Sequence, residues 1–142
     1  MIDEQIEMIL AKQARAGLPP FYELSPEQAR VLYNNEKLSG PKEAIFRVED
    51  LYIPTSSNKI PIRMYTPEGK GPFGVFLYFH GGGWVIGNLD SFDSLCRTLA
   101  NRIGCVVISV DYRLAPEYKF PAAIEDAYAA VQWTYEHALR YN

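Results

Sequence analysis

The sequence predicts an α/β protein in which a helical segment precedes a mixed sheet. Three observations predict this class. Residues 1–40 show helical apolar spacing, residues 44–65 hold two strand-like runs, and residues 73–135 alternate strand, helix, strand and helix. A strand, a helix and a second buried strand in that order imply a right-handed parallel crossover. We therefore expect residues 1–40 to form a helical cap segment and residues 41–142 to form the first half of an α/β sheet domain.

Two amphipathic helices are expected within the cap segment. The first spans residues 2–16 and stops at Gly17. Its predicted apolar face consists of Ile2, Ile6, Ile9, Leu10 and Ala14. The second begins at Ser25, because Pro26 suits the first helical position and Gln28 can complete a capping box.

Strand-like sequence follows. Residues 44–53 and 58–65 alternate apolar and polar side chains, which predicts an antiparallel pair. Residues 73–79 are almost continuously apolar, as in a strand that is buried on both faces, and we expect this strand to be central. Residues 105–110 form the next buried strand.

Each of these two buried strands leads into a helix. The first helix is capped by Asp90 or Ser91 and runs to Gly104. Its apolar positions are Phe92, Leu95, Cys96, Leu99 and Ile103. The last helix opens at Pro121 and repeats apolar residues on one side. These residues are Ile124, Ala127, Tyr128, Val131 and Tyr135.

Composition excludes several classes of protein. The chain is 48% hydrophobic with a net charge of −3, and its basic residues are scattered, which argues against a nucleic-acid partner. Residues 1–17 have neither a basic signal-peptide start nor a long apolar stretch, so we expect no membrane span and a cytoplasmic location. Cys96 and Cys105 have no second ligand at metal-binding spacing and are predicted to be buried free thiols.

A glycine-rich loop, His80-Gly81-Gly82-Gly83-Trp84, follows directly on the apolar strand. Three successive glycines let backbone amides turn toward one point, because no Cβ obstructs them, and converging amides can hold an oxyanion. Two nucleotide-binding alternatives fail. A dinucleotide fingerprint needs glycine where Ile86 stands, and a phosphate-binding P-loop needs lysine where Asn88 stands. A tight turn without a ligand remains the alternative.

Three motifs in order, H-G-G-G-W at 80–84, D-Y-R-L-A-P-E at 111–117 and F-P-A-A at 120–123, resemble the hormone-sensitive-lipase family of esterases. The resemblance spans essentially all 142 residues. It implies an α/β-hydrolase fold whose helical cap covers an acyl pocket. It also implies hydrolysis of short or medium acyl esters through a serine acyl-enzyme, with no metal or organic cofactor.

The catalytic triad of that family is not expected in these residues. The family's nucleophile lies on a Gly-x-Ser-x-Gly elbow, and none of the seven serines has these flanking glycines. No aspartate and histidine follow a serine in the order that the fold uses. We therefore expect the chain to be inactive alone, with the C-terminal half present as a separate chain or deleted.

The resemblance assigns roles to the glycine loop. The amides of Gly82 and Gly83 are the expected oxyanion donors, in a hole formed by Gly81, Gly82 and Gly83. His80 is expected to support this loop through hydrogen bonds and not to act as a base. Trp84 either lines the acyl pocket, together with Phe21 and Tyr22, or belongs to the core, and the sequence leaves this open.

A second segment also carries chemistry-bearing side chains. Asp111, Arg113 and Glu117 could form an acid/base pair with an arginine clamp. The resemblance instead implies a rigid supporting turn whose charges pair with one another around Tyr112. His137, near the end of the last helix, is expected to be solvated or to partner the helix C-terminus, without a catalytic role.

Two alternatives to an ester hydrolase remain open, namely a non-catalytic ligand-binding module of the same fold and an inactive truncated product. The expected partners are a small ester and the missing C-terminal half. Self-association is a further expectation, because residues 73–79 would present an unpaired apolar edge without that half.

Overall fold

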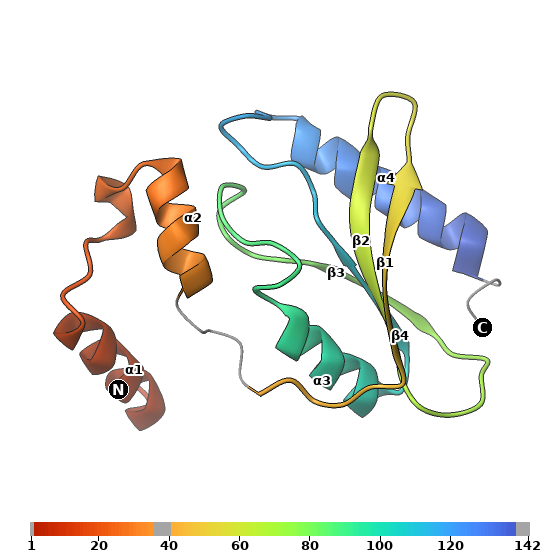
Figure 1. Ribbon diagram of the computed structural model, residues 1–142, viewed down its shortest axis with the longest axis horizontal. Coiled ribbons are helices and arrows are strands. Elements are labelled where there is room, and N and C mark those ends of the chain that lie inside the picture. The colour runs from red at the N-terminus through yellow and green to blue at the C-terminus, as the bar shows by residue number, and fades with distance from the viewer. Residues whose placement is uncertain (1, 36–40, 139–142) are drawn as a thin grey trace.

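The computed structural model describes residues 2–35 and 41–138, and Figure 1 shows the arrangement of its helices and strands. The residues between these ranges, 36–40, include the predicted boundary of the cap segment and lie outside the described residues. In chain order the elements are α1 (Glu4–Arg15), η1 (Phe21–Glu23), α2 (Pro26–Asn35), β1 (Arg47–Pro54), β2 (Lys59–Thr66), β3 (Val75–Phe79), α3 (Asp93–Ile103), β4 (Val106–Val110) and α4 (Ala122–His137).

The described strands form a mixed sheet in the order β1-β2-β4-β3. β1 and β2 are antiparallel, with Leu51 opposite Ile62, which confirms the predicted pair. β3 and β4 are parallel, with Leu77 opposite Ile108, which confirms the predicted parallel pairing. All five residues of β4 are buried because the strand is flanked on both sides and covered on both faces.

The apolar strand is expected to be central in the complete sheet and to form an unpaired edge without the C-terminal half, and the described residues confirm the edge. β3 lies at the edge, where β4 is its only strand partner among the residues that the structure describes. Phe76 is 40% exposed and Phe79 is 37% exposed. A continuously apolar sequence therefore does not by itself bury a strand, because burial also needs a neighbour on each side.

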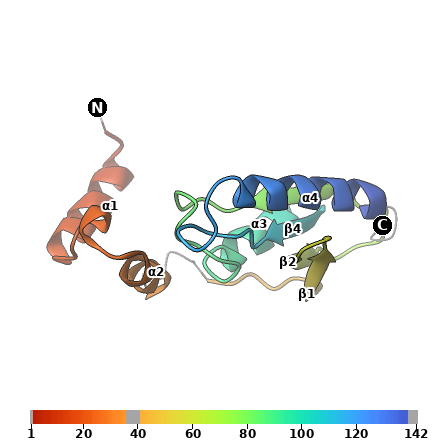
Figure 2. The same cartoon turned by 90° about the horizontal axis from the view of Figure 1, so that it is seen from above.

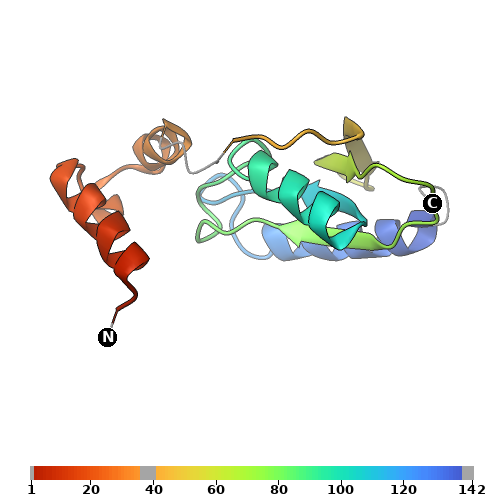
Figure 3. The same ribbon diagram turned by 90° about the horizontal axis from the view of Figure 1, so that it is seen from below.

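The two helices of the sheet domain cover opposite faces of the sheet (Figures 2 and 3). The α4 face packs Ala130 and Trp133 against alternate residues of the strands, such as Ile62 and Ile108. The α3 face packs Cys96 and Ala100 against Tyr65 and Val107. Neighbouring residues of a strand point to opposite faces, so each strand contributes to both clusters.

The predicted cap of α3 is wrong. The helix begins at Asp93 with Phe92 as N-cap, and no side chain caps it. Both predicted caps are used elsewhere, because Asp90 accepts a hydrogen bond from Arg63 (2.7 Å) and the Ser91 hydroxyl donates to Asn88 Oδ1 (2.9 Å). The predicted end is confirmed, since Gly104 is the C-cap in the left-handed conformation.

Asp93 ties α3 to its surroundings from a buried position. Its carboxylate is 1% exposed and accepts hydrogen bonds from Arg97 Nε (2.9 Å) and the Tyr65 hydroxyl (3.0 Å), and it lies 2.9 Å from Lys42 Nζ. Burial alone raises the pKa of the Asp93 carboxyl, but the hydrogen bonds from Lys42, Arg97 and Tyr65 outweigh burial and hold this pKa below its usual value.

We expect Asp93→Asn to lower the free energy of unfolding by about 1.5 to 3 kcal/mol, because it removes the buried carboxylate that accepts charge-assisted hydrogen bonds from Arg97 and Lys42. Because the folded pKa of Asp93 is depressed, its stabilising contribution is present above the unfolded pKa and is lost as the pH falls through the folded pKa. Urea unfolding at several acidic pH values measures both effects. Glu49→Gln, at an exposed pair with Arg47, is the matched control with an expected change near zero. Equal midpoints for the two variants would contradict the prediction.

The predicted apolar side of α4 does not face the sheet. The buried positions of this helix are Ala122, Asp126, Ala130 and Thr134. Of the predicted stripe, Ile124, Tyr128, Val131 and Tyr135 are exposed, and only Ala127 is half-buried. The helix has two apolar sides. The periodicity identified the side with Ile124 and Val131, which no described residues bury, and not the side with Ala130, which packs on the sheet.

The N-terminal helices lie to one side of the sheet domain (Figure 1). The predicted capping box of α2 is confirmed, because the Ser25 amide donates to Gln28 Oε1 (2.9 Å) and the Gln28 amide to Ser25 Oγ (3.3 Å). α1 runs from Glu4 to Arg15, and its predicted apolar residues Ile6 and Leu10 are about half exposed.

Candidate functional site

His80 is buried directly beneath the glycine loop. Its ring stacks between Tyr112, at a centroid distance of 4.4 Å, and Phe92, at 5.6 Å. Its Nδ1 lies 2.9 Å from the carbonyl oxygen of Gly81. A carbonyl only accepts hydrogen bonds, so Nδ1 carries the proton and donates it. The ring is thus held by its neighbours and in turn holds the first peptide of the loop.

Gly82 has a conformation and surroundings that only glycine fits. Its φ is +135°, and a Cβ at this position would lie 2.0 Å from the carbonyl oxygen of Ile86. The Gly82 carbonyl accepts hydrogen bonds from the amides of Val85 (3.1 Å) and Ile86 (3.0 Å). The loop therefore closes into a tight turn immediately after Gly82.

The backbone carbonyls and the backbone amides of the loop differ in their hydrogen bonding. Carbonyls of the loop are bonded, since that of Gly81 accepts from His80, that of Gly82 from Val85 and Ile86, and that of Trp84 from the Ala115 amide (2.8 Å). In contrast, the amides of residues 81–84 donate to no acceptor among the described residues.

These bonded carbonyls also set the direction of the free amides. In a trans peptide unit the carbonyl and the amide point in opposite directions. Fixing the Gly81 carbonyl on His80 turns the Gly82 amide away from the ring, and fixing the Gly82 carbonyl turns the Gly83 amide away from the turn. The loop thus presents free, rigidly held donors, which is what an anion-stabilising site requires.

Asp111 and Tyr112 contact His80 from the end of β4. The Tyr112 hydroxyl donates to the His80 carbonyl at 2.5 Å. The Asp111 Oδ1 lies 4.0 Å from His80 Nε2, and that nitrogen is buried without a hydrogen-bond partner among the described residues. Burial is the main cause that raises the pKa of the Asp111 carboxyl, and the nearby His80 opposes it.

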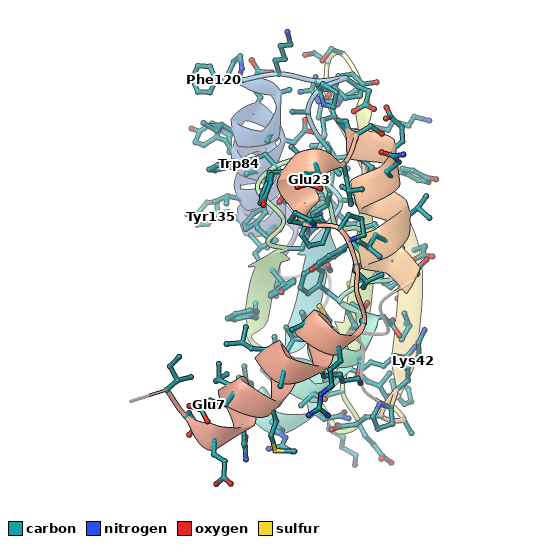
Figure 4. The ribbon with its side chains drawn as sticks, turned by 90° about the vertical axis from the view of Figure 1, so that its left-hand side faces the viewer. Glu7, Glu23, Lys42, Trp84, Phe120 and Tyr135 are labelled. Atoms are coloured by element: carbon teal, nitrogen blue, oxygen red, sulfur yellow. The ribbon has the colours of Figure 1, made fainter. Side chains whose placement is uncertain are left out.

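Two cavities border the loop. The larger has a volume of about 500 Å³ and is mainly apolar; it is lined by Gly83, Trp84, Ala115, Tyr118, Phe120, Pro121, Ala123 and Ile124. The second, of about 220 Å³, is lined by Phe79, His80, Trp84, Tyr112, Ala123, Ile124 and Ala127. Trp84 is 65% exposed and borders both, so it is no core residue (Figure 4). Phe21 and Tyr22 are exposed on η1 and line neither cavity.

Comparisons with known proteins agree with the fold. A family model described as alpha/beta hydrolase fold matches residues 76–142. The carboxylic ester hydrolase LipN of Mycobacterium tuberculosis is 48% identical over 103 residues, covering 72% of this chain and 27% of that protein. An arylesterase of Saccharolobus solfataricus is 34% identical over 138 residues, covering 96% of this chain and 45% of that protein. A solved structure of a Pyrobaculum calidifontis esterase superposes with a TM-score of 0.84 at 35% identity, covering 99% of this chain and 45% of that chain.

The chain belongs to the hormone-sensitive-lipase-type family of α/β-hydrolases. It spans less than half the length of the three relatives just described. Among its described residues, no helix is long and apolar enough to cross a membrane. Within the same residues, no three histidine, cysteine, aspartate or glutamate side chains cluster so that they could hold a metal ion.

The segment that follows β4 differs from the expectation in its charge pairing. Arg113 binds Asp126 of α4, with Nη2 2.8 Å from Oδ1, and Glu117 binds Arg30 of α2 at 2.7 Å. The charges of this segment therefore do not pair with one another around Tyr112. They reach outward because a turn between a strand and a helix places successive side chains toward different neighbours. Arg113 and Glu117 join the segment to two helices, and neither is arranged as an acid/base pair with Asp111.

The remaining candidates lie as predicted. His137 Nδ1 lies 2.8 Å from the Trp133 carbonyl oxygen, near the C-terminal end of α4. Cys96 and Cys105 are buried free thiols. Burial raises the pKa of the Cys96 thiol to about 11, so it is protonated and unreactive at neutral pH.

Sequence reasoning missed Gly87, which lies against the histidine. Its φ is +97°, and a Cβ there would lie 2.6 Å from His80 Nδ1 and 2.9 Å from the Gly81 carbonyl oxygen. No motif marks this glycine, because position 87 needs a glycine only where the folded loop passes close to the His80 ring. The signal that could have identified it is a further glycine a few residues after the glycine-rich loop.

We expect Gly87→Ala to break the hydrogen bond between His80 and the Gly81 carbonyl, because the methyl group and the imidazole cannot occupy the same space. The nitrogen chemical shifts of the imidazole in ¹⁵N-labelled protein measure the change. Gly81→Ala is the matched control, since a Cβ at Gly81 meets nothing within 4 Å. Unchanged His80 shifts in a folded Gly87→Ala variant would contradict the close contact.

Proposed function

We propose that residues 80–84 form the oxyanion hole of a carboxylic ester hydrolase, with the amides of Gly82 and Gly83 as donors. The observation that carries this proposal is the division within the loop, where carbonyls are bonded and successive amides are free. The relatives named as carboxylic ester hydrolase, arylesterase and esterase support the same reaction.

In the proposed reaction a serine attacks the ester carbonyl and forms an acyl-enzyme, which water then hydrolyses. The carbonyl oxygen becomes an oxyanion in each tetrahedral intermediate, and amides held in place beforehand stabilise that charge without reorganising. His80 supports the loop, with Asp111, Tyr112 and Arg113 holding its surroundings. No organic cofactor or metal is required in this scheme.

The substrate class follows from the larger cavity beside the loop. Its apolar lining and volume of about 500 Å³ suit an ester with a short or medium acyl chain. Trp84 and Phe120 lie at this cavity and project from the same side of the molecule (Figure 4). We also propose a cytoplasmic location, which agrees with two cysteines left as free thiols.

A polypeptide of these 142 residues alone is expected to show no burst and no turnover on nitrophenyl esters. The sequence has no Gly-x-Ser-x-Gly elbow, and donors without a nucleophile cannot form an acyl-enzyme. Even an enzyme that keeps its oxyanion hole but lacks the triad retains only about 10³- to 10⁴-fold over water. Stopped-flow absorbance measures the rate, and labelling of any of the seven serines by a fluorophosphonate would contradict the prediction.

The test of the function itself needs a complete enzyme. One route joins residues 1–142 to the remaining part of a relative, such as the arylesterase, at the end of α4. Ester turnover by the chimaera supports the hydrolase. A folded chimaera that binds esters without turning them over would favour the ligand-binding module instead.

A further inference from the structure

Arg30 of α2 bridges the N-terminal helices and the sheet domain. Its Nε donates to the Val85 carbonyl (2.8 Å) and its Nη2 to the Ala115 carbonyl (2.8 Å). Its Nη1 and Nη2 also bind the two carboxylate oxygens of Glu117, at 2.8 and 2.7 Å. The side chain is 26% exposed, so water competes only in part for these donors.

The other contacts of α2 reach the same region. Asn34 Oδ1 accepts from Ser91 Oγ (3.1 Å), and the Tyr33 ring lies 6.4 Å from the Phe92 ring, which stacks on His80. These contacts involve neutral side chains. Among the described residues of α2, Arg30 binds the main chain beside the glycine loop.

Both carbonyls that Arg30 binds belong to residues already bonded to that loop. The Val85 amide donates to the Gly82 carbonyl, and the Ala115 amide donates to the Trp84 carbonyl (2.8 Å). Arg30 therefore joins the two segments that hold the turn closed. Without the Arg30 side chain, Val85 and Ala115 lose the partner that they share. The turn that directs the Gly82 and Gly83 amides then keeps its own hydrogen bonds but loses the contact with α2.

We propose that Arg30 is a positioning residue for the oxyanion loop, so that docking of α2 fixes the direction of the loop amides. An effect of Arg30 on catalysis rests on the proposed function. A planar guanidinium can bind a carboxylate with two donors and still reach two carbonyls, whereas the compact ammonium of lysine cannot span all three partners. The hydrogen bonds to Glu117 also raise the pKa of Arg30 above its usual value, so the cation persists at every pH at which the protein folds.

Residue-resolved amide hydrogen exchange on the complete chimaera tests the proposal. In Arg30→Met, the amides of Val85, Ile86 and Ala115 are expected to exchange about tenfold faster, which corresponds to about 1.4 kcal/mol of lost local stability. The β4 amides of Val107 and Ile108 are expected to stay within twofold of the wild-type rates. Arg30→Lys should restore little of the protection.

The matched control is Arg15→Met, on the exposed last turn of α1, which should leave all of these rates unchanged. Unchanged exchange at Val85 and Ala115 in Arg30→Met would overturn the proposal. Equal acceleration across the loop and β4 would also overturn it, because Arg30 would then support global stability alone.

A kinetic readout separates this inference from the proposed function. In the complete chimaera, Arg30→Met is expected to lower kcat about tenfold while KM stays within twofold. The exchange result does not depend on ester hydrolysis. Faster exchange in a chimaera that hydrolyses no ester would leave Arg30 as a loop-positioning residue and remove the catalytic function, whereas active enzyme with unchanged kcat would overturn the role of Arg30.

Discussion

Gly82→Ala is expected to lower kcat by about 10²- to 10³-fold in a complete enzyme that contains this segment, with KM nearly unchanged. The reason lies in the turn after Gly82. A Cβ at this position would lie 2.0 Å from the Ile86 carbonyl oxygen, and the φ of +135° is one that alanine rarely adopts. The peptide between Gly82 and Gly83 must therefore rotate, which breaks the hydrogen bonds from Val85 and Ile86. One methyl group thus misdirects both proposed donors.

Steady-state kinetics on a nitrophenyl ester measure this effect. Gly81→Ala is the control within the same loop, because a Cβ at Gly81 meets no atom within 4 Å, and its kcat is expected within a few-fold of wild type. Circular dichroism and cooperative unfolding establish that each variant folds. A folded Gly82→Ala enzyme with unchanged kcat would refute the donor assignment, whereas equal losses in both variants would indicate a general loop requirement.

The 142-residue polypeptide alone is expected to self-associate through β3 and not to persist as a stable monomer. β3 is an edge strand whose sequence, Val-Phe-Leu-Tyr-Phe, has no charge and no proline. Natural sheets protect their edges with charged residues and prolines. The opposite edge, β1, is protected, since it carries Arg47, Glu49, Asp50 and Pro54.

The uncovered side of α4 adds to this surface. Ile124 is 57% exposed and Val131 48% exposed, while Phe79 of β3 lines a cavity with Ile124. Full burial of one such side chain contributes about 1.5 to 3 kcal/mol. The burial of several such side chains together is comparable to the stability of a whole domain, which is about 5 to 15 kcal/mol. Pairing through this surface therefore offsets the cost of association.

Sedimentation velocity across the micromolar range measures this self-association. Phe76→Lys places a charge on the β3 edge and is expected to weaken association at least about tenfold. Tyr52→Lys, at an exposed position on β1, is the matched control and should leave association unchanged. A wild-type monomer with strongly protected amides throughout Val75–Phe79 would show the argument to be wrong.

Much of the fold could be predicted from the sequence because its determinants are local. Alternation over 44–65, the capping box at Ser25 and the αL glycine at position 104 each depend on neighbours a few residues away, and the structure confirms them. The starting residue of α3 could not be predicted in this way. The Asp90 carboxylate and the Ser91 hydroxyl have the right chemistry for a cap, but Arg63 and Asn88 bind them in the folded chain.

The place of the glycine loop was also visible in the sequence, because three glycines after an apolar strand need no tertiary information to be recognised. Which loop groups are free was not visible. That division depends on His80, on Ala115 and on the return of Gly87 past the imidazole. The α2 contribution was hidden for the same reason, since 55 positions separate Arg30 from Val85.

The sequence by itself determined the class of the fold, the antiparallel and parallel strand pairs and the position of the candidate oxyanion loop, since these follow from periodicity, from turn chemistry and from one short motif. Only the tertiary structure decided that α4 packs its Ala122, Asp126, Ala130 and Thr134 side against the sheet. It also decided that the charges after β4 bind α2 and α4. Periodicity reports which side chains are apolar, whereas the partner of each side chain depends on segments far along the chain, and those meet only in the folded protein.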